Sequence, residues 1–199
     1  MKLFGVRASK GETAVAAEAL PAPIDPFEAE ASLRPAPSIG DVASAQTTAP
    51  GTEIRYDPQL IPHFVEAHRG LSALAIRLKA KVVEGRYIEA TQLLRQFQTD
   101  IFRHFLEENV RLYTYLACCL KTDPEGGAMM ANTRREMGEI GRAITRFLKI
   151  YEMGVDMDNA DSFLDRLEGV VATLADRIRR EESSLYTMYR APSEFAANS

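Results

Sequence analysis

Two pairs of ionisable residues share a spacing of four in this chain. His104 and Glu108 form one pair, and Arg177 and Glu181 form the other. One helical turn would bring both members of a pair to the same side, about 6 Å apart along the helix axis. Each pair interrupts a series of apolar residues, as does His68 nearer the N-terminus. Because buried polar groups cost free energy unless they are satisfied, we expect these five residues to meet in one polar site.

A metal ion is one partner that could satisfy this site. Imidazole and carboxylate groups ligate Fe and Zn, and two imidazoles with one or two carboxylates suffice for a single ion with an open position. The candidate metal ligands are His68, His104, Glu108 and Glu181.

A metal-free network is the alternative for the same residues. Glu108 and Glu181 would place two negative charges in a core of low dielectric constant, where burial and mutual repulsion are both unfavourable. The Arg177 guanidinium could offset them through charge-assisted hydrogen bonds, with the histidines completing the network. Buried ionic groups are often structural, so the sequence favours this interpretation without excluding a metal.

Long helices must position these residues, because apolar residues recur at intervals of three and four along most of the chain. Asp57 and Pro58 predict the start of the first helix, as its N-cap and its first helical residue. Gly85 predicts the end of that helix, because glycine adopts the left-handed conformation that often follows a helix. The second helix is expected to run from about Tyr87 to Leu120.

Two further helices complete the folded part. A turn is expected at residues 123–127, Asp-Pro-Glu-Gly-Gly, followed by a third helix that ends near Gly154. The fourth helix carries Arg177 and Glu181 and ends before Pro192. Four helices of about 25–35 residues with short connections predict an all-α fold, an antiparallel up-down-up-down four-helix bundle. Sites in such bundles are built in the core from facing side chains.

The same spacing of three and four residues predicts which residues face the core beyond the two glutamates. The inward positions after the two glutamates are Arg111, Tyr115, Ser184 and Met188. Arg111 lies near enough to its helix end to extend outward. Tyr113 and Tyr186 are expected to pack against neighbouring side chains, and Glu182 is assigned to a solvated charged face.

Residues 1–55 differ in composition from the predicted bundle at residues 56–191. They contain six of the ten prolines, many Ala and Ser, and two aromatic residues, Phe4 and Phe27. Such a segment buries too little apolar surface to offset its conformational entropy, so we expect a disordered tail. Residues 192–199 are expected to form a disordered C-terminus.

Charge and hydropathy argue against several classes of protein. The 199 residues carry a formal net charge of −4 and no long basic stripe, which argues against a nucleic-acid surface. No apolar run approaches the roughly 20 residues that cross a bilayer, so we expect a cytoplasmic protein without membrane contact. The adjacent Cys118 and Cys119 suit reduced thiols better than a structural disulfide. The sequence contains no phosphate-binding loop or catalytic triad, so we do not expect an enzyme.

Taken in order, the motifs resemble the hemerythrin-like, or HHE cation-binding, four-helix bundles. That family has a His on the first helix, His-x-x-x-Glu on the second, a His on the third and His-x-x-x-Glu on the fourth, often followed by Glu and by Leu-Tyr. The segments that carry the resemblance are Ala67–Leu71, His104–Tyr113 and Arg177–Tyr186, within about residues 58–190. The resemblance implies a helical bundle that binds a cation.

Two departures limit what the resemblance implies. The third helix offers no His on its inward face, and Arg177 replaces the first ligand of the fourth helix. A di-iron centre of the kind that binds O₂ is therefore not expected, whereas a degenerate site for one Fe or Zn ion remains. We expect a sensory or regulatory module.

A weaker resemblance is to the bacterial regulator-of-sigma-D family, whose members bind the primary sigma factor of RNA polymerase. It rests on Ala131-Asn-Thr133 and on Phe163 through Glu182. It implies a metal-free bundle that binds a protein partner, a component of signalling or transcription.

Overall fold

The computed structural model describes residues 48–196, whereas residues 1–47 and 197–199, with the disorder predicted for them, lie outside the described part. The first helix is α1 (Leu60–Val83). The second, α2 (Tyr87–Glu107), continues through a π-helical segment, η2 (Glu108–Tyr113), into α3 (Thr114–Cys119). The third is α4 (Pro124–Ile150). The fourth, α5 (Ala160–Arg180), continues through a second π-helical segment, η3 (Glu181–Leu185), into a 3₁₀ turn, η4 (Tyr186–Met188), and the short α6 (Pro192–Ala196) comes last.

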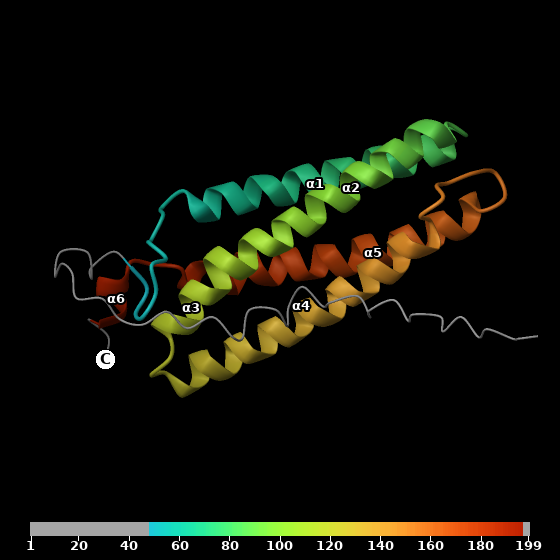
Figure 1. Cartoon of the computed structure of the whole chain (residues 1–199). Coiled ribbons are helices and arrows are strands. Elements are labelled where there is room, and N and C mark those ends of the chain that lie inside the picture. Colours follow the sequence, from blue (N-terminus) through green and yellow to red (C-terminus); the bar gives the residue numbers. More distant parts are fainter. Residues whose placement is uncertain (1–47, 197–199) are drawn as a thin grey trace, which may run out of the picture. The chain divides into compact units, whose positions relative to one another are not determined.

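Successive long helices run in opposite directions (Figure 1). α1 packs against both α2 and α5, α4 packs against α5, and α3 meets α4. Residues 48–196 contain no strand, apart from an isolated bridge between Thr48 and Arg55, and none of their helices is long and apolar enough to span a membrane. The predicted all-α four-helix bundle is confirmed.

Glycines with positive φ come after α1 and α4, as the sequence predicts. Gly85 has a φ of 71° and Gly154 has a φ of 108°. At Gly154 a Cβ would come within 2.8 Å of the Thr91 hydroxyl oxygen, and that same oxygen accepts a hydrogen bond from the Val155 N–H at 2.9 Å. The loop before α5 is therefore held against α2 at a place where only glycine fits.

Both Asp-Pro pairs precede helices, but their roles differ from the prediction. α1 begins at Leu60 rather than at Pro58, because the Asp57 carbonyl accepts from the Leu60 N–H at 3.0 Å and forms a turn before the helix. At the other pair, the predicted turn is the first turn of α4. The Asp123 side chain caps it, accepting from the Glu125 N–H at 3.0 Å, and Pro124 is the first helical residue.

The π-helical segments change which residues face the core. Arg111 extends outward and pairs with Asp57 at 2.7 Å, Ser184 is exposed, and Met188 is half-buried. The residues buried instead are Leu112, Tyr113, Leu185 and Tyr186. A π-helix bonds residue i to residue i+5, so each segment holds one residue more than an α-helical turn and shifts the stepping beyond it. The predicted inward position of Ser184 is therefore wrong, whereas Tyr115 is buried as predicted.

Ordered structure extends beyond the limits predicted for the bundle. Ala49, which the sequence assigns to the tail, is buried, and its N–H donates to the Ile54 carbonyl at 2.8 Å. At the other end, α6 occupies residues that the sequence assigns to a disordered C-terminus. Short segments of this kind carry too weak a periodic signal to be predicted from sequence.

Candidate metal centre

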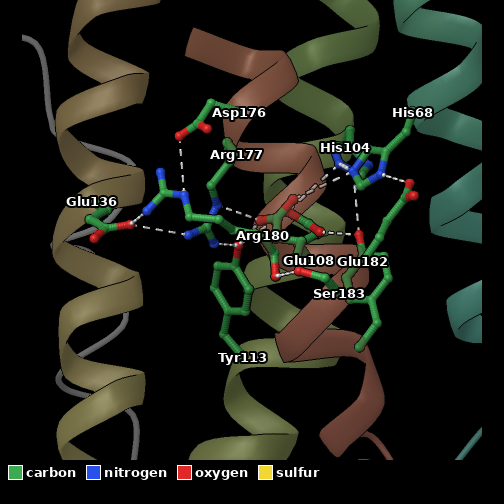
Figure 2. A network of polar contacts seen from close by, with 12 residues as sticks. His68, His104, Glu108, Tyr113, Glu136, Asp176, Arg177, Arg180, Glu182 and Ser183 are labelled. Atoms are coloured by element: carbon green, nitrogen blue, oxygen red, sulfur yellow. Dashed lines mark hydrogen bonds and ion pairs between the residues drawn. The ribbon is translucent and has the colours of Figure 1, made fainter.

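Five ionisable side chains meet in the core where α1, α2 and α5 face one another (Figure 2). His68 comes from α1 and His104 from α2. Arg177 lies near the end of α5, and each π-helical segment begins with a glutamate, Glu108 in η2 and Glu181 in η3. All five are no more than 5% exposed. The structure thus brings together the two pairs that are spaced four residues apart and His68.

The π-helical segments add a tyrosine to each pair. Tyr113 lies five residues after Glu108, and Tyr186 lies five residues after Glu181. Residues five apart lie on opposite sides of an α-helix but on the same side of a π-helix. Both tyrosines are accordingly buried and donate hydrogen bonds to site carboxylates. The tyrosines are buried against neighbouring side chains, as predicted, and they also hydrogen-bond to the site, which the prediction did not include.

An ion pair occupies one half of the site. The Arg177 Nε donates to Glu181 Oε1 at 2.7 Å, and its Nη2 donates to the Tyr113 hydroxyl at 2.7 Å. The Tyr113 hydroxyl in turn donates to Glu181 Oε1 at 2.8 Å. On the side of α4, Glu136 accepts from Arg177 at 3.4 Å and from Arg180 at 2.8 Å. The guanidinium therefore offsets the charge of Glu181 and not, by direct contact, that of Glu108.

The other half of the site contains the two imidazoles and Glu108. Their ligand-capable atoms all lie within 4.8 Å of one another. His68 Nε2 is 3.0 Å from His104 Nε2, and His104 Nε2 is 3.6 Å from Glu108 Oε2. His68 Nε2 is also 3.6 Å from Glu181 Oε2. Four polar atoms from three helices thus converge on a small volume.

The tautomer of His68 is set by its second ring nitrogen. His68 Nδ1 lies 2.9 Å from Glu182 Oε1, and because a carboxylate only accepts, Nδ1 carries the proton. In the neutral ring, Nε2 then carries no hydrogen and presents a lone pair to the interior. Histidines that ligate metals are commonly oriented in this way by a carboxylate on the other nitrogen. Glu182, which the sequence assigns to a solvated face, is thus a positioning residue for His68.

Burial sets the charge of the metal-free cluster. Burial and the neighbouring Glu181 raise the pKa of Glu108 to about 8, and burial with the neighbouring His68 lowers the pKa of His104 to about 3. Burial and the two carboxylates also raise the pKa of Tyr186. Burial opposes the charge of Arg177, but the oxygens of Tyr113 and Glu181 outweigh it and raise the pKa of Arg177. At neutral pH the metal-free site therefore has a neutral His104 and a largely protonated Glu108 beside the Arg177–Glu181 pair.

The donor set fits one cation. Two ligand atoms that each lie about 2.1 Å from one ion are about 3.0–3.5 Å apart in octahedral or tetrahedral geometry, close to the separations found here. His104 Nε2 is the ring nitrogen that faces this donor set, 3.0 Å from His68 Nε2 and 3.6 Å from Glu108 Oε2, whereas the buried Nδ1 faces away from it and has no hydrogen-bond partner. A second ion is not provided for, because Arg177 lies where the fourth helix would supply a ligand and α4 contains no His.

Other candidate groups lie apart from the cluster. Cys118 and Cys119 are half-buried free thiols, and burial raises the pKa of both, that of Cys119 to about 11. Thiolate chemistry is therefore disfavoured at neutral pH. The third histidine of the chain, His63, has a side chain that is 54% exposed and pairs with Glu107 at 2.8 Å.

Sequence reasoning missed four residues of the network: Tyr113, Glu136, Glu182 and Tyr186. One signal could have found the tyrosines, namely the spacing Glu-x-x-x-x-Tyr, which occurs after both site glutamates. Glu182 could have been found from the family pattern, in which a second Glu often follows the one of the fourth helix. Glu136 has no such signal, because it is partly exposed and lies off the apolar stripe of its helix.

Comparison with known proteins gives one finding. The model of the hemerythrin HHE cation-binding domain matches residues 59–189, a range that includes every residue of the cluster. No curated protein and no solved structure matches the chain significantly. The match agrees with the resemblance that the motifs predict, and nothing supports the weaker resemblance to the sigma regulators.

Proposed function

Because the chain belongs to the hemerythrin HHE cation-binding family, we propose that it is a regulatory module built around a site for a single Fe or Zn ion. The observation that carries this proposal is the convergence of His68, His104 and Glu108, all buried, with ligand atoms within 4.8 Å of one another. Buried ligands from separate helices make the site part of the fold rather than a surface feature.

His68, His104 and Glu108 would hold the ion, which would supply a positive charge and, in the case of iron, a redox couple. The surrounding residues of the chain prepare that position. Glu182 orients His68 by accepting from Nδ1, and Arg177 keeps Glu181 paired beside it. A cation would also offset Glu108, whose carboxylate is otherwise unfavourable in the core.

A regulatory role agrees with the reach of the network. Hydrogen bonds connect His68 on α1, His104 on α2, Glu136 on α4 and Arg177 on α5 through shared partners. Loss or gain of a cation would change the charge at the centre of all four helices at once. A partner that binds one packing arrangement of the helices more tightly than another, such as a signalling or transcription component, would then respond to whether the cation is bound.

A metal-free interaction module is the second candidate, and one observation favours it. Arg177 already satisfies Glu181 and Tyr113, and Tyr186 donates to Glu108 Oε1 at 2.6 Å, so most of the network is complete without an ion. On this alternative the polar core is structural and the function lies in binding a protein partner.

Metal analysis separates the two candidates. The full chain, purified without an affinity tag, is loaded anaerobically with Fe(II) or with Zn(II), freed of excess metal and assayed for ions per chain. We expect one ion in the wild type, none in His104→Ala, and one in His63→Ala, which removes an exposed histidine as the matched control.

The opposite result would leave the metal-free candidate. If neither ion is retained by the wild type, or if His104→Ala and His63→Ala retain it equally, cation binding at this cluster is wrong. Capture of partners by the full chain and by a chain without residues 1–55 would then ask whether the bundle or the preceding segment makes the contact.

A further inference from the structure

Tyr186 has a position in the cluster that neither its matched residue Tyr113 nor any other tyrosine of the described chain has. Its hydroxyl donates to Glu108 Oε1 at 2.6 Å and lies 3.3 Å from His68 Nε2. Tyr113, at the same place in the other π-helical segment, contacts Arg177, Glu181 and Glu108, but neither histidine. One tyrosine thus belongs to the ion pair, and the other belongs to the imidazole half.

Packing fixes the ring of Tyr186. It lies parallel to the His68 ring, with centroids 5.8 Å apart and an angle of 8° between the planes, and it also contacts Phe64. The residue is 5% exposed. The rings of His68 and Phe64 therefore hold the Tyr186 hydroxyl beside the imidazole and the carboxylate.

His68 Nε2 has more polar neighbours than its single lone pair can bond to. With its proton on Nδ1, this nitrogen offers a single lone pair, yet His104 Nε2 lies at 3.0 Å and the Tyr186 oxygen at 3.3 Å. Both separations are those of neighbouring ligands on one ion, about 3.0–3.5 Å for metal–ligand bonds of about 2.1 Å. A common cation would satisfy all three atoms, whereas one hydrogen bond satisfies two.

We propose that Tyr186 is a fourth ligand of the cation site and binds ferric iron there as a phenolate. This inference rests on the proposed function, since it concerns the same site. As the oxygen–metal bond forms, the phenol O–H bond breaks, and the Tyr186 proton passes to solvent together with the proton that Glu108 carries in the metal-free site. No electron is transferred, because the iron is supplied as Fe(III). Phenolate oxygen is a ligand that proteins use for ferric iron, as in the tyrosine ligand of catalase haem.

The test uses a signature that a structural tyrosine would not give. A phenolate bound to Fe(III) absorbs visible light by charge transfer and shows phenolate vibrations in resonance Raman spectra, whereas Zn(II) gives neither. The untagged full chain, Tyr186→Phe and Tyr151→Phe are each loaded with ferric citrate and freed of excess iron. Tyr151→Phe is the matched control, because it removes a buried hydroxyl that lies 3.1 Å from Ser162 Oγ, outside the cluster. Iron per chain, visible absorption and resonance Raman spectra are recorded, with circular dichroism as the check on folding.

We expect the band and the phenolate vibrations in the wild type and in Tyr151→Phe, and their complete loss in Tyr186→Phe while its helical signal is kept. Iron bound by the wild type without the band, or a band that survives in Tyr186→Phe, would overturn the assignment of Tyr186 and leave the cation site standing. A band lost in both variants at equal iron content would also overturn it. Failure of the wild type to bind iron from ferric citrate would overturn this inference, whereas the proposed function falls only if Fe(II) and Zn(II) are not retained either.

Discussion

At the scale of single residues, the two carboxylates of the cluster are made unequal by one arginine. Arg177 bonds to Glu181 directly but reaches Glu108 only through Tyr113. Glu108 is fully buried and its pKa is raised to about 8, first by burial and then by the charge of Glu181. The division explains how a polar core can be tolerated without a metal and still leave one carboxyl group ready to become a ligand.

The raised pKa of Glu108 has a consequence for the stability of the metal-free protein. A carboxyl group with a higher pKa in the folded state binds its proton more tightly there, so its contribution is present below pH 4.5 and is lost as the pH rises toward 8. Glu108→Gln cannot lose a proton. We expect the free energy of unfolding of the wild type to fall relative to this variant between pH 4.5 and 8, by on the order of several kcal/mol.

Urea unfolding of both proteins in the presence of a chelator, at several pH values, measures this difference. Titration of His104, whose pKa is lowered to about 3 by burial, destabilises the folded state below pH 6.5, but it is common to both proteins and cancels in the comparison. A difference that does not change with pH would show that Glu108 is not protonated in the metal-free fold.

Removal of Arg177 is expected to be costly for the metal-free protein. Arg177→Met would leave Glu181 buried at 2% exposure without its guanidinium, and breaking a buried ion pair from one side costs roughly 3–5 kcal/mol. Arg179→Met is the matched control, because the Arg179 side chain is 71% exposed and pairs with Asp176 on the surface, a contact worth roughly 0.2–1 kcal/mol. Equal losses in the two variants, measured by urea unfolding, would contradict a role for Arg177 in the core.

At the scale of helices, the two π-helical segments are the devices that build the site. Each begins at a site glutamate and ends at or next to the tyrosine whose hydroxyl bonds to the cluster. A π-helical segment holds one residue more than an α-helix needs, so the chain can lose that residue there without rotating the next helical turns. The same loss in a regular helix would turn every later side chain by about 100°.

Two single-residue deletions test this difference. Deletion of Val110, a partly exposed residue within η2, should leave α3 in register and preserve cooperative unfolding. Deletion of Arg103, an exposed residue within regular α2, should displace His104, Glu108 and the core beyond them and abolish cooperative unfolding. Thermal circular dichroism distinguishes the two outcomes, and equal tolerance of both deletions would contradict the structural role given to η2.

The sequence predicted the helices and the five central residues well, but not the tyrosines. Periodicity of three and four reports which face of an α-helix is buried, and this was enough to place His68, His104 and Arg177 in one site. The same periodicity assumes 3.6 residues per turn throughout, so it assigned Ser184 to the core in place of Tyr186. Glu136, at the rim of the network, could not be predicted, because a partly exposed acidic residue on a helix is ordinary.

At the scale of the whole molecule, the cluster couples the state of one site to the stability of the described bundle. A cation that binds the folded state and not the unfolded chain stabilises the fold by mass action, by about 2.7 kcal/mol when its free concentration is 100 times its dissociation constant. We expect the thermal midpoint of the wild type and of His63→Ala to rise on loading with Fe(II) or Zn(II), and that of His104→Ala to stay unchanged. A rise of the same size in His104→Ala would place the binding of the ion elsewhere.

We propose that the cluster holds one cation, and that the Arg177 guanidinium takes the place of a second. X-ray absorption at the iron edge of the loaded full chain tests it most directly, because it reports the ligands of the ion and any metal neighbour. The account predicts one shell of nitrogen and oxygen ligands, the outer-shell scattering of imidazole from His68 and His104, and no metal–metal scattering. A metal–metal vector, or a shell without imidazole, would contradict it.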